Sequence, residues 1–120
     1  MNTPDTTRPR LVQAWRSELS AAGACRVSGD LAGEWGHLER AHILSQPMAR
    51  HHVRTHLAML GAGIRRHDHR EILGQLARTI VAGPGTLTGR YPIGNTGGAN
   101  VPAMAAMPIP TDLQAVLDGV

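Results

Sequence analysis

The chain repeats a pattern after 38 residues, and this repeat limits the folds open to it. Small residues recur where helices would cross, and an aspartate recurs at the turn. The matched residues are Gly23, Ala24, Asp30, Gly36, Leu38 and Arg40 in the first unit, and Gly61, Ala62, Asp68, Gly74, Leu76 and Arg78 in the second. A chain of 120 residues can bury one core but is too short for separate catalytic and binding domains. We therefore expect one all-α domain built from two antiparallel helical hairpins.

Apolar periodicity and stop signals predict four helices within residues 10–82. The first helix covers residues 10–27, and Asp30 is the expected N-cap of the second. Pro47 separates the second helix from the third, and Asp68 with Glu71 has the spacing of a capping box at the start of the fourth. Short links make successive helices antiparallel neighbours. The apolar stripe expected on the third helix consists of Val53, Leu57, Leu60 and Ile64.

The flanking segments are expected to be a flexible N-terminus over residues 1–9 and an irregular tail over residues 83–110. The tail contains six glycines and five prolines and has no apolar periodicity. It is nevertheless too apolar for a solvated linker, which predicts that it wraps against the helices. Its large apolar residues are Leu87, Tyr91, Ile93, Val101, Met104, Met107 and Ile109. A capping box of Thr111 and Gln114 predicts a short final helix over residues 111–118.

Composition and charge argue against several classes of protein. The net charge of +3 comes with nine acids scattered among the arginines, and the chain has one Tyr and no Phe, which disfavours nucleic-acid binding. The single cysteine, Cys25, excludes an intramolecular disulfide and fits a reducing compartment. The polar start has no apolar stretch behind it, so neither a signal peptide nor a membrane segment is indicated. We expect a cytoplasmic protein that does not contact a membrane.

Acids and histidines recur at helical spacing on the apolar faces of the first three predicted helices. They are Glu18 on the first helix, Glu39 and His42 on the second, and His52 and His56 on the third. Polar groups on a core face are costly to desolvate unless they are paired, hydrogen-bonded or bound to a metal. A Glu-x-x-His pair that faces a His-x-x-x-His pair on an antiparallel neighbour can place four ligands around one point.

These five residues are therefore the candidate metal ligands. Glu18 would be a fifth ligand or an acceptor that orients one imidazole. A mixture of imidazole and carboxylate suits zinc, iron, copper, nickel or manganese rather than calcium. No organic cofactor is indicated. One Glu-x-x-His pair is fewer than a carboxylate-bridged two-metal site requires.

A wider polar cleft is expected if the polar face of the fourth helix meets the histidines. Its members would be Gln46, Glu71, Gln75, Arg78 and Asn95. Such a set could bind a small polar ligand, a peptide end or a metal oxyanion. The glycine-rich segment over residues 94–98 lacks the lysine and the strand-to-helix context of a phosphate loop, so turn chemistry explains it better.

A purely structural interpretation explains the same residues. Each histidine could be a hydrogen-bonded core residue, and Glu39 could pair with Arg78 or another arginine. Glu71 is better explained as the capping-box partner of Asp68 than as a ligand. Three further histidines, His51, His67 and His69, lie in or near exposed stretches and are expected to be solvated.

Two family resemblances follow from longer motifs. The run GDLAGEWGHLERAHIL over residues 29–44 resembles the second half of a tetratricopeptide repeat, although the first-helix aromatic and glycine of such repeats are missing or displaced. The runs HLERAHILSQ (37–46), DHREILGQLAR (68–78), GRYPIGNTGG (89–98) and MPIP (107–110), with the spaced histidines, resemble a family of small bacterial proteins of unknown function. This second resemblance covers nearly the whole chain. It implies a common helical fold and a shared polar site, but no activity. The residues that match are Glu39, Arg40, His42, Gln46, His52, His56, Gly94, Asn95 and Gly97.

Three hypotheses for function remain open. The first is a protein that binds a transition metal between the second and third helices. The second is a non-catalytic, tetratricopeptide-like interaction module whose groove receives a protein, a peptide or a second copy of the chain. The third is a small enzyme in which His42 or His56 is a general base.

Overall fold

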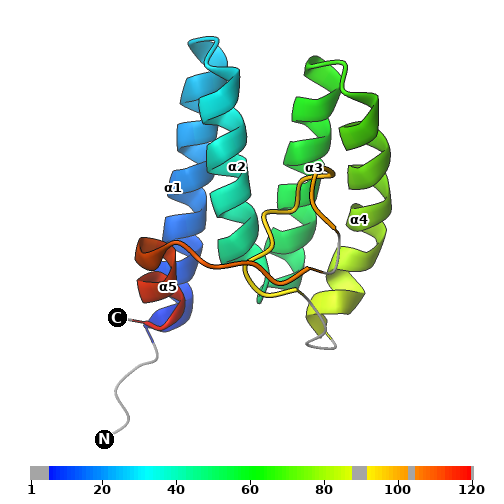
Figure 1. Cartoon of the computed structure of the whole chain (residues 1–120). Coiled ribbons are helices and arrows are strands. Elements are labelled where there is room, and N and C mark those ends of the chain that lie inside the picture. The colour runs from blue at the N-terminus through cyan, green and yellow to red at the C-terminus, as the bar shows by residue number, and fades with distance from the viewer. Residues whose placement is uncertain (1–5, 88–91, 103–104, 120) are drawn as a thin grey trace, which may run out of the picture.

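The computed structural model describes residues 6–87, 92–102 and 105–119, and in residues 80–87 only the backbone. It contains α1 (Thr7–Val27), α2 (Leu31–Ser45), α3 (Ala49–Arg65), α4 (His69–Leu87) and α5 (Thr111–Leu117). The predicted all-α class, the paired hairpins and the short last helix are confirmed (Figure 1). The expectations for Tyr91, Met104 and the Leu87 side chain lie outside the described residues. None of the described helices is long and apolar enough to cross a membrane.

The two turns inside the hairpins are built in the same way, as the repeat predicts. Asp30 Oδ1 accepts a hydrogen bond from Gly33 N at 2.9 Å, and Asp68 Oδ1 accepts one from Glu71 N at 3.1 Å. The residue before each aspartate has positive φ, 78° at Gly29 and 53° at His67. Histidine tolerates this region better than branched residues do. The predicted N-caps of α2 and α4 therefore both form.

Two helix boundaries and one helix cap differ from the prediction. The first helix begins at Thr7, so residues 7–9 are helical. The backbone of α4 continues to Leu87, through the Gly and Pro residues that were expected to end it at residue 82. Adding a residue to an existing helix is easier than starting one, so local breaking residues can be overridden. Pro110 is the N-cap of α5 without a side-chain bond, and Gln114 Nε2 donates to Asp118 Oδ1 at 2.8 Å. The capping box predicted for α5 is therefore wrong.

The core is divided between two apolar clusters. One joins α1, α2 and α5 through Leu11, Trp15, Ala41, Ile43, Leu44, Met48 and Leu113. The other lies where α3 packs on the first hairpin, through Ala22, Leu38, Met59 and Ala62. Within the hairpins, α1 packs on α2 and α3 packs on α4, while α2 and α3 make fewer contacts with each other.

The buried face of α3 is not the apolar stripe that the sequence predicts. Leu57 is 49% exposed and Ile64 is 53% exposed. The face that is buried instead carries His52, Thr55, His56, Met59, Ala62 and Gly63. Polar side chains can occupy this face because they are satisfied: Trp15 Nε1, for example, donates to Thr55 Oγ1 at 2.9 Å. The apolar periodicity predicted the wrong buried face of α3, because it takes no account of hydrogen bonds that satisfy buried polar side chains.

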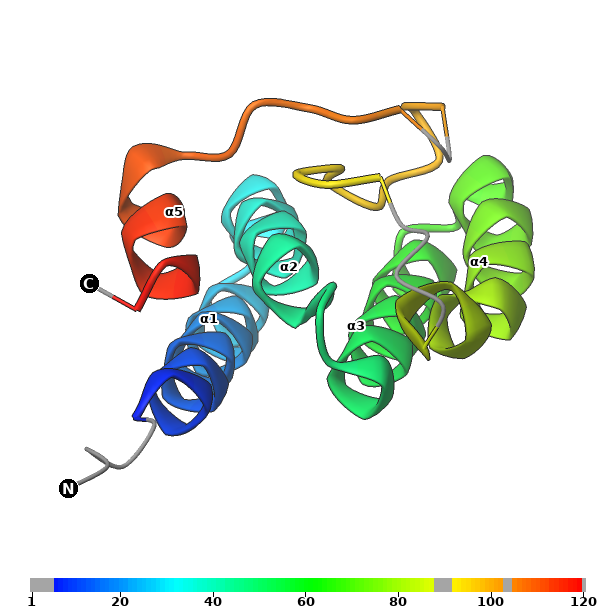
Figure 2. The ribbon, with the colours of Figure 1, turned by 90° about the horizontal axis from the view of Figure 1, so that it is seen from below.

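The described parts of the segment after α4 cross one side of α2, α3 and α4 and lead to α5, which packs on α1 and α2 (Figure 2). Gln46 at the end of α2 holds this segment through both ends of its amide. Its Nε2 donates to Pro92 O at 2.7 Å, and its Oε1 accepts from Gly94 N at 3.0 Å. Further along the chain, Met107 donates its N–H to Ile93 O at 3.0 Å. We call residues 92–102 the strap.

Candidate metal centre

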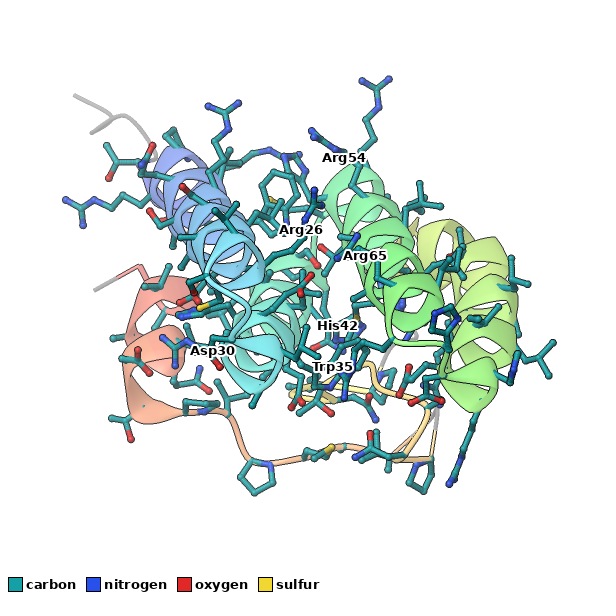
Figure 3. The ribbon with its side chains drawn as sticks, turned by 90° about the horizontal axis from the view of Figure 1, so that it is seen from above. Arg26, Asp30, Trp35, His42, Arg54 and Arg65 are labelled. Atoms are coloured by element: carbon teal, nitrogen blue, oxygen red, sulfur yellow. The ribbon has the colours of Figure 1, made fainter. Side chains whose placement is uncertain are left out.

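Three histidine side chains meet between α2, α3 and the strap. His42 comes from α2, and His52 and His56 lie one turn apart on α3, so all three rings face one point. Their Nε2 atoms form a nearly equilateral triangle with edges of 3.1 Å (His42 to His52), 3.1 Å (His42 to His56) and 3.2 Å (His52 to His56). Each residue is at most 5% exposed. Figure 3 shows His42 between the two helices. We call these three residues the histidine triad.

Backbone and side-chain acceptors fix the protonation of two of the rings. His42 Nδ1 lies 2.6 Å from Asn95 O, and His56 Nδ1 lies 2.6 Å from Gln75 Oε1. A carbonyl oxygen can only accept a hydrogen bond, so each Nδ1 carries the proton. In a neutral imidazole the other nitrogen then holds a lone pair, and both Nε2 lone pairs are directed into the triangle.

The amide of Gln75 is itself oriented, which makes the assignment at His56 firm. Gln75 Nε2 donates to Gly97 O at 2.6 Å and to Glu71 Oε2 at 3.1 Å. Both partners are acceptors, so the nitrogen faces them and the oxygen faces His56. Glu71 Oε1 in turn accepts from Ala99 N at 2.6 Å. A chain of hydrogen bonds therefore runs from the strap through α4 to the triad.

The surroundings of His42 and His56 favour the neutral form of both imidazoles. Burial, together with the neighbouring His56 and His52, holds the pKa of His42 well below its usual 6.5, although the bond to the Asn95 carbonyl acts in the opposite direction. Burial also lowers the pKa of His56, with the Gln75 bond opposing it and Arg78 adding to it. Neutral imidazole is the form that binds metal ions.

Gly97 closes the strap against the triad. Its φ is +84°, and a Cβ atom placed on it would lie 2.6 to 2.9 Å from three atoms of the His42 ring. Only glycine tolerates both this backbone conformation and this approach. Asn95 supports the same turn, because its Oδ1 accepts from Gly97 N at 2.8 Å while its Nδ2 donates to Pro102 O and Ala105 O.

The two predicted acidic ligands are not part of the triad. Glu18 accepts from His37 Nδ1 at 2.7 Å and from Arg40 Nε at 2.8 Å, which ties α1 to α2. Glu39 is half-buried near Trp35 and Glu71. Burial, and then the negative charge of Glu71, raise the pKa of Glu39 above 4.5. Among the described histidines, cysteines and acids, the group close enough to share one ion is the histidine triad.

The residues predicted to line a polar cleft instead hold the strap. Gln46, Gln75 and Asn95 are buried and bond to it or within it, as described above. Arg78 Nη1 donates to Gly97 O at 3.0 Å and its Nη2 to Val101 O at 2.9 Å. Arg78 therefore binds main-chain oxygens of the strap and not Glu39, one of the partners that a purely structural interpretation allowed. The Glu71 carboxylate accepts hydrogen bonds from Gln75 and from Ala99 N. The capping-box role expected for this side chain is therefore wrong.

The other histidines have mixed surroundings. His67 and His69 are exposed, as expected. His51 is half-buried with its ring edge-on to Trp15 at 4.6 Å, and its Nδ1 is buried without a hydrogen-bond partner, so the expectation that it is solvated is wrong. Sequence reasoning also missed the main-chain oxygen of Asn95, because no side-chain pattern marks a carbonyl as an acceptor.

The triad matches the donor geometry of a transition-metal site. An ion about 2.0–2.1 Å from each nitrogen requires nitrogen separations of about 2.9 Å in octahedral and about 3.3 Å in tetrahedral geometry. The observed edges of 3.1 to 3.2 Å fall between these values. Ligating histidines usually donate their other ring N–H to a carbonyl or carboxylate, as His42 and His56 do here.

Comparison with known proteins gives a family but no activity. No curated protein and no solved structure matches the chain. One family model, described as a protein of unknown function (DUF3703), matches residues 9–117. The match covers the four long helices, the strap and α5. The chain therefore belongs to the DUF3703 family, whose function is unknown.

Proposed function

We propose that this protein binds one transition-metal ion through His42, His52 and His56. The single observation that carries the proposal is the 3.1 Å separation of His42 Nε2 and His56 Nε2, two atoms whose rings carry their protons on the opposite side. Two nitrogen lone pairs held that close in a buried site repel each other, and no proton of their own lies between them. A cation at the centre of the triangle removes this repulsion.

The donor set favours a metal of the later first transition series. Three neutral imidazoles suit zinc, copper, nickel and iron, and the affinity of such a site rises from manganese to copper. A carboxylate-rich site for calcium or magnesium would need oxygen ligands, and Glu18 and Glu39 are engaged elsewhere. The remaining coordination positions would be filled by water or another small ligand.

Enclosure by the strap favours holding an ion over turning over a substrate. The triad residues are 3%, 5% and 3% exposed, and Gly97 lies against the His42 ring. A general base must reach the proton that it abstracts, which these imidazoles could do only if the strap moved. We therefore rank the binding role above the catalytic role for His42 and His56.

The proposal is tested by elemental analysis of untagged protein loaded with zinc, copper or nickel and then desalted. We expect one ion per chain, and His42→Ala and His56→Ala each to abolish retention while circular dichroism still reports a helical protein. His69→Ala removes an exposed histidine and is the matched control, which should retain the ion. Retention of metal by both triad variants, or release by the parent after desalting, would refute the assignment.

A further inference from the structure

The first hairpin holds α3 in a groove between α1 and α2, and this groove has an equivalent in the second hairpin. Ala22 and Leu38 pack directly on Met59 and Ala62 of α3, with Leu19 and Trp35 at the edges. Trp15 reaches α3 through its hydrogen bond to Thr55. Stacking one hairpin on the next is thus how this fold covers such a groove.

The repeat places apolar residues at the same positions of the second hairpin. A shift of 38 residues carries Trp15, Leu19, Ala22, Trp35 and Leu38 onto Val53, Leu57, Leu60, Leu73 and Leu76. Within the described part of the chain no helix covers this second groove. Leu57 is 49%, Leu73 is 68% and Leu76 is 48% exposed. Clustered apolar residues with this exposure mark an interaction surface.

Three arginines of α3 and its C-cap contact the first hairpin. The Arg54 guanidinium lies 5.3 Å from the ring centre of Trp15, and that of Arg66 lies 5.5 Å from the ring centre of Trp35. Arg65 donates to Glu34 of α2. Figure 3 shows Arg54 and Arg65 on the side of α3 that faces the first hairpin. Arg54 and Arg65 of α3, and Arg66 at its C-cap, are therefore engaged with the first hairpin.

The two ends of the molecule differ, which decides how copies could meet. The outer face of α1 is polar, with exposed Arg10, Gln13, Arg16, Ser17 and Ser20. An apolar groove cannot pack on that face, so stacking head to tail into a fibre is disfavoured. Two apolar grooves that face each other form a closed, twofold contact. A polar first unit and an apolar last unit are what one expects when only one end of a repeat array is capped.

We propose that the groove lined by Val53, Leu57, Leu60, Leu73 and Leu76 is the dimer interface of this protein, closed by the same groove of a second copy. The second copy supplies the helical hairpin that a longer array would contain. The interface lies on the side of α4 away from the strap, whose contacts are with Gly74, Gln75 and Arg78. The inference therefore does not depend on the metal proposal.

Sedimentation velocity over a range of concentrations tests this interface. The parent should sediment with twice the mass of the chain and dissociate on dilution, and both Leu57→Glu and Leu76→Glu should be monomeric at concentrations where the parent is dimeric. Because both positions are half-exposed, each variant should keep the helical circular dichroism of the parent. Val27→Glu, at a residue 88% exposed on α1, is the matched control and should remain dimeric.

Three results would overturn the proposal. They are a parent that is monomeric at every concentration, a Leu57→Glu or Leu76→Glu variant that is folded and still dimeric, and a Val27→Glu variant that is monomeric. A monomeric parent would assign the groove to a different protein.

Discussion

His56 donates its Nδ1 proton to Gln75 Oε1 across 2.6 Å, and this bond connects the centre of the molecule to its strap. Gln75 is completely buried, and its Nε2 donates hydrogen bonds to Gly97 O and to Glu71 Oε2. One amide thereby fixes the tautomer of a candidate ligand and the position of the segment that covers it. If the triad binds a metal as we propose, Gln75 couples that binding to the docking of the strap.

Gln75→Ala should weaken zinc binding about 10- to 100-fold, the usual effect of removing a hydrogen-bond partner of a ligating histidine. His56 would lose the acceptor that orients its ring, while its Nε2 would remain available. Competition with a coloured chelator measures the change. Gln13→Ala, at an exposed position on α1, is the control and should bind like the parent. Unchanged affinity in Gln75→Ala would show that the amide does not orient a ligand.

Gly97→Ala should lower the stability of the protein by roughly 1–3 kcal/mol, the range for a non-glycine residue held in a strained backbone conformation. The added Cβ would meet the His42 ring at 2.6 Å, so metal affinity should fall as well. Urea unfolding and metal titration check the two effects. In contrast, Gly23→Ala has nothing within 4 Å of the new atom and should gain about 0.5–1 kcal/mol. Equal effects of the two variants would contradict the close contact.

Gln46→Ala should speed metal exchange more than it weakens metal affinity. The amide holds Pro92 O and Gly94 N, the start of the strap, but Gln46 itself is not in the triad. Loosening the strap would open the route to the triad and leave the three nitrogens in place. Stopped-flow transfer of zinc to a chelator gives the exchange rate, and hydrogen exchange of the Gly94 amide reports strap opening. A slower or unchanged rate would place the route elsewhere.

Glu39→Gln should raise the melting temperature at neutral pH. Because burial and then Glu71 raise the pKa of Glu39 above 4.5, the folded carboxyl holds its proton more tightly than the unfolded one. Its ionisation therefore reduces stability as the pH rises through the window above 4.5. The amide removes that effect, so the difference in stability between variant and parent should shrink as the pH is lowered toward 4.5. A variant less stable than the parent at neutral pH would mean that the Glu39 charge is favourable.

The sequence predicted the helices well because turn chemistry and repeat spacing are local. Asp30 and Asp68 act as N-caps in both turns, and His42, His52 and His56 converge as their helical spacing requires. The sequence failed where a distant partner decides the outcome. Glu18 is bound by His37 and Arg40 rather than joining the histidines, and no spacing rule reveals that competition.

The buried face of α3 is a second case in which distant hydrogen-bond partners, and not local periodicity, decide the structure. Leu57 and Ile64 form the more apolar side, yet Thr55 and His56 are buried, because Trp15 and Gln75 satisfy them. A hydrogen bond between residues 40 positions apart leaves no trace in local periodicity. Leu57, on this exposed side, lies in the groove that we propose as a dimer interface.

X-ray absorption spectroscopy of zinc-loaded protein tests the central claim most directly, because it identifies and counts the ligands. The structure predicts three imidazole nitrogens at about 2.0–2.1 Å, with the scattering pattern of intact imidazole rings. One or more oxygen ligands in addition to the three imidazoles would agree with this prediction. A sulfur ligand, a shell with fewer than three imidazoles, or a protein that retains no zinc would contradict the account of the histidine triad.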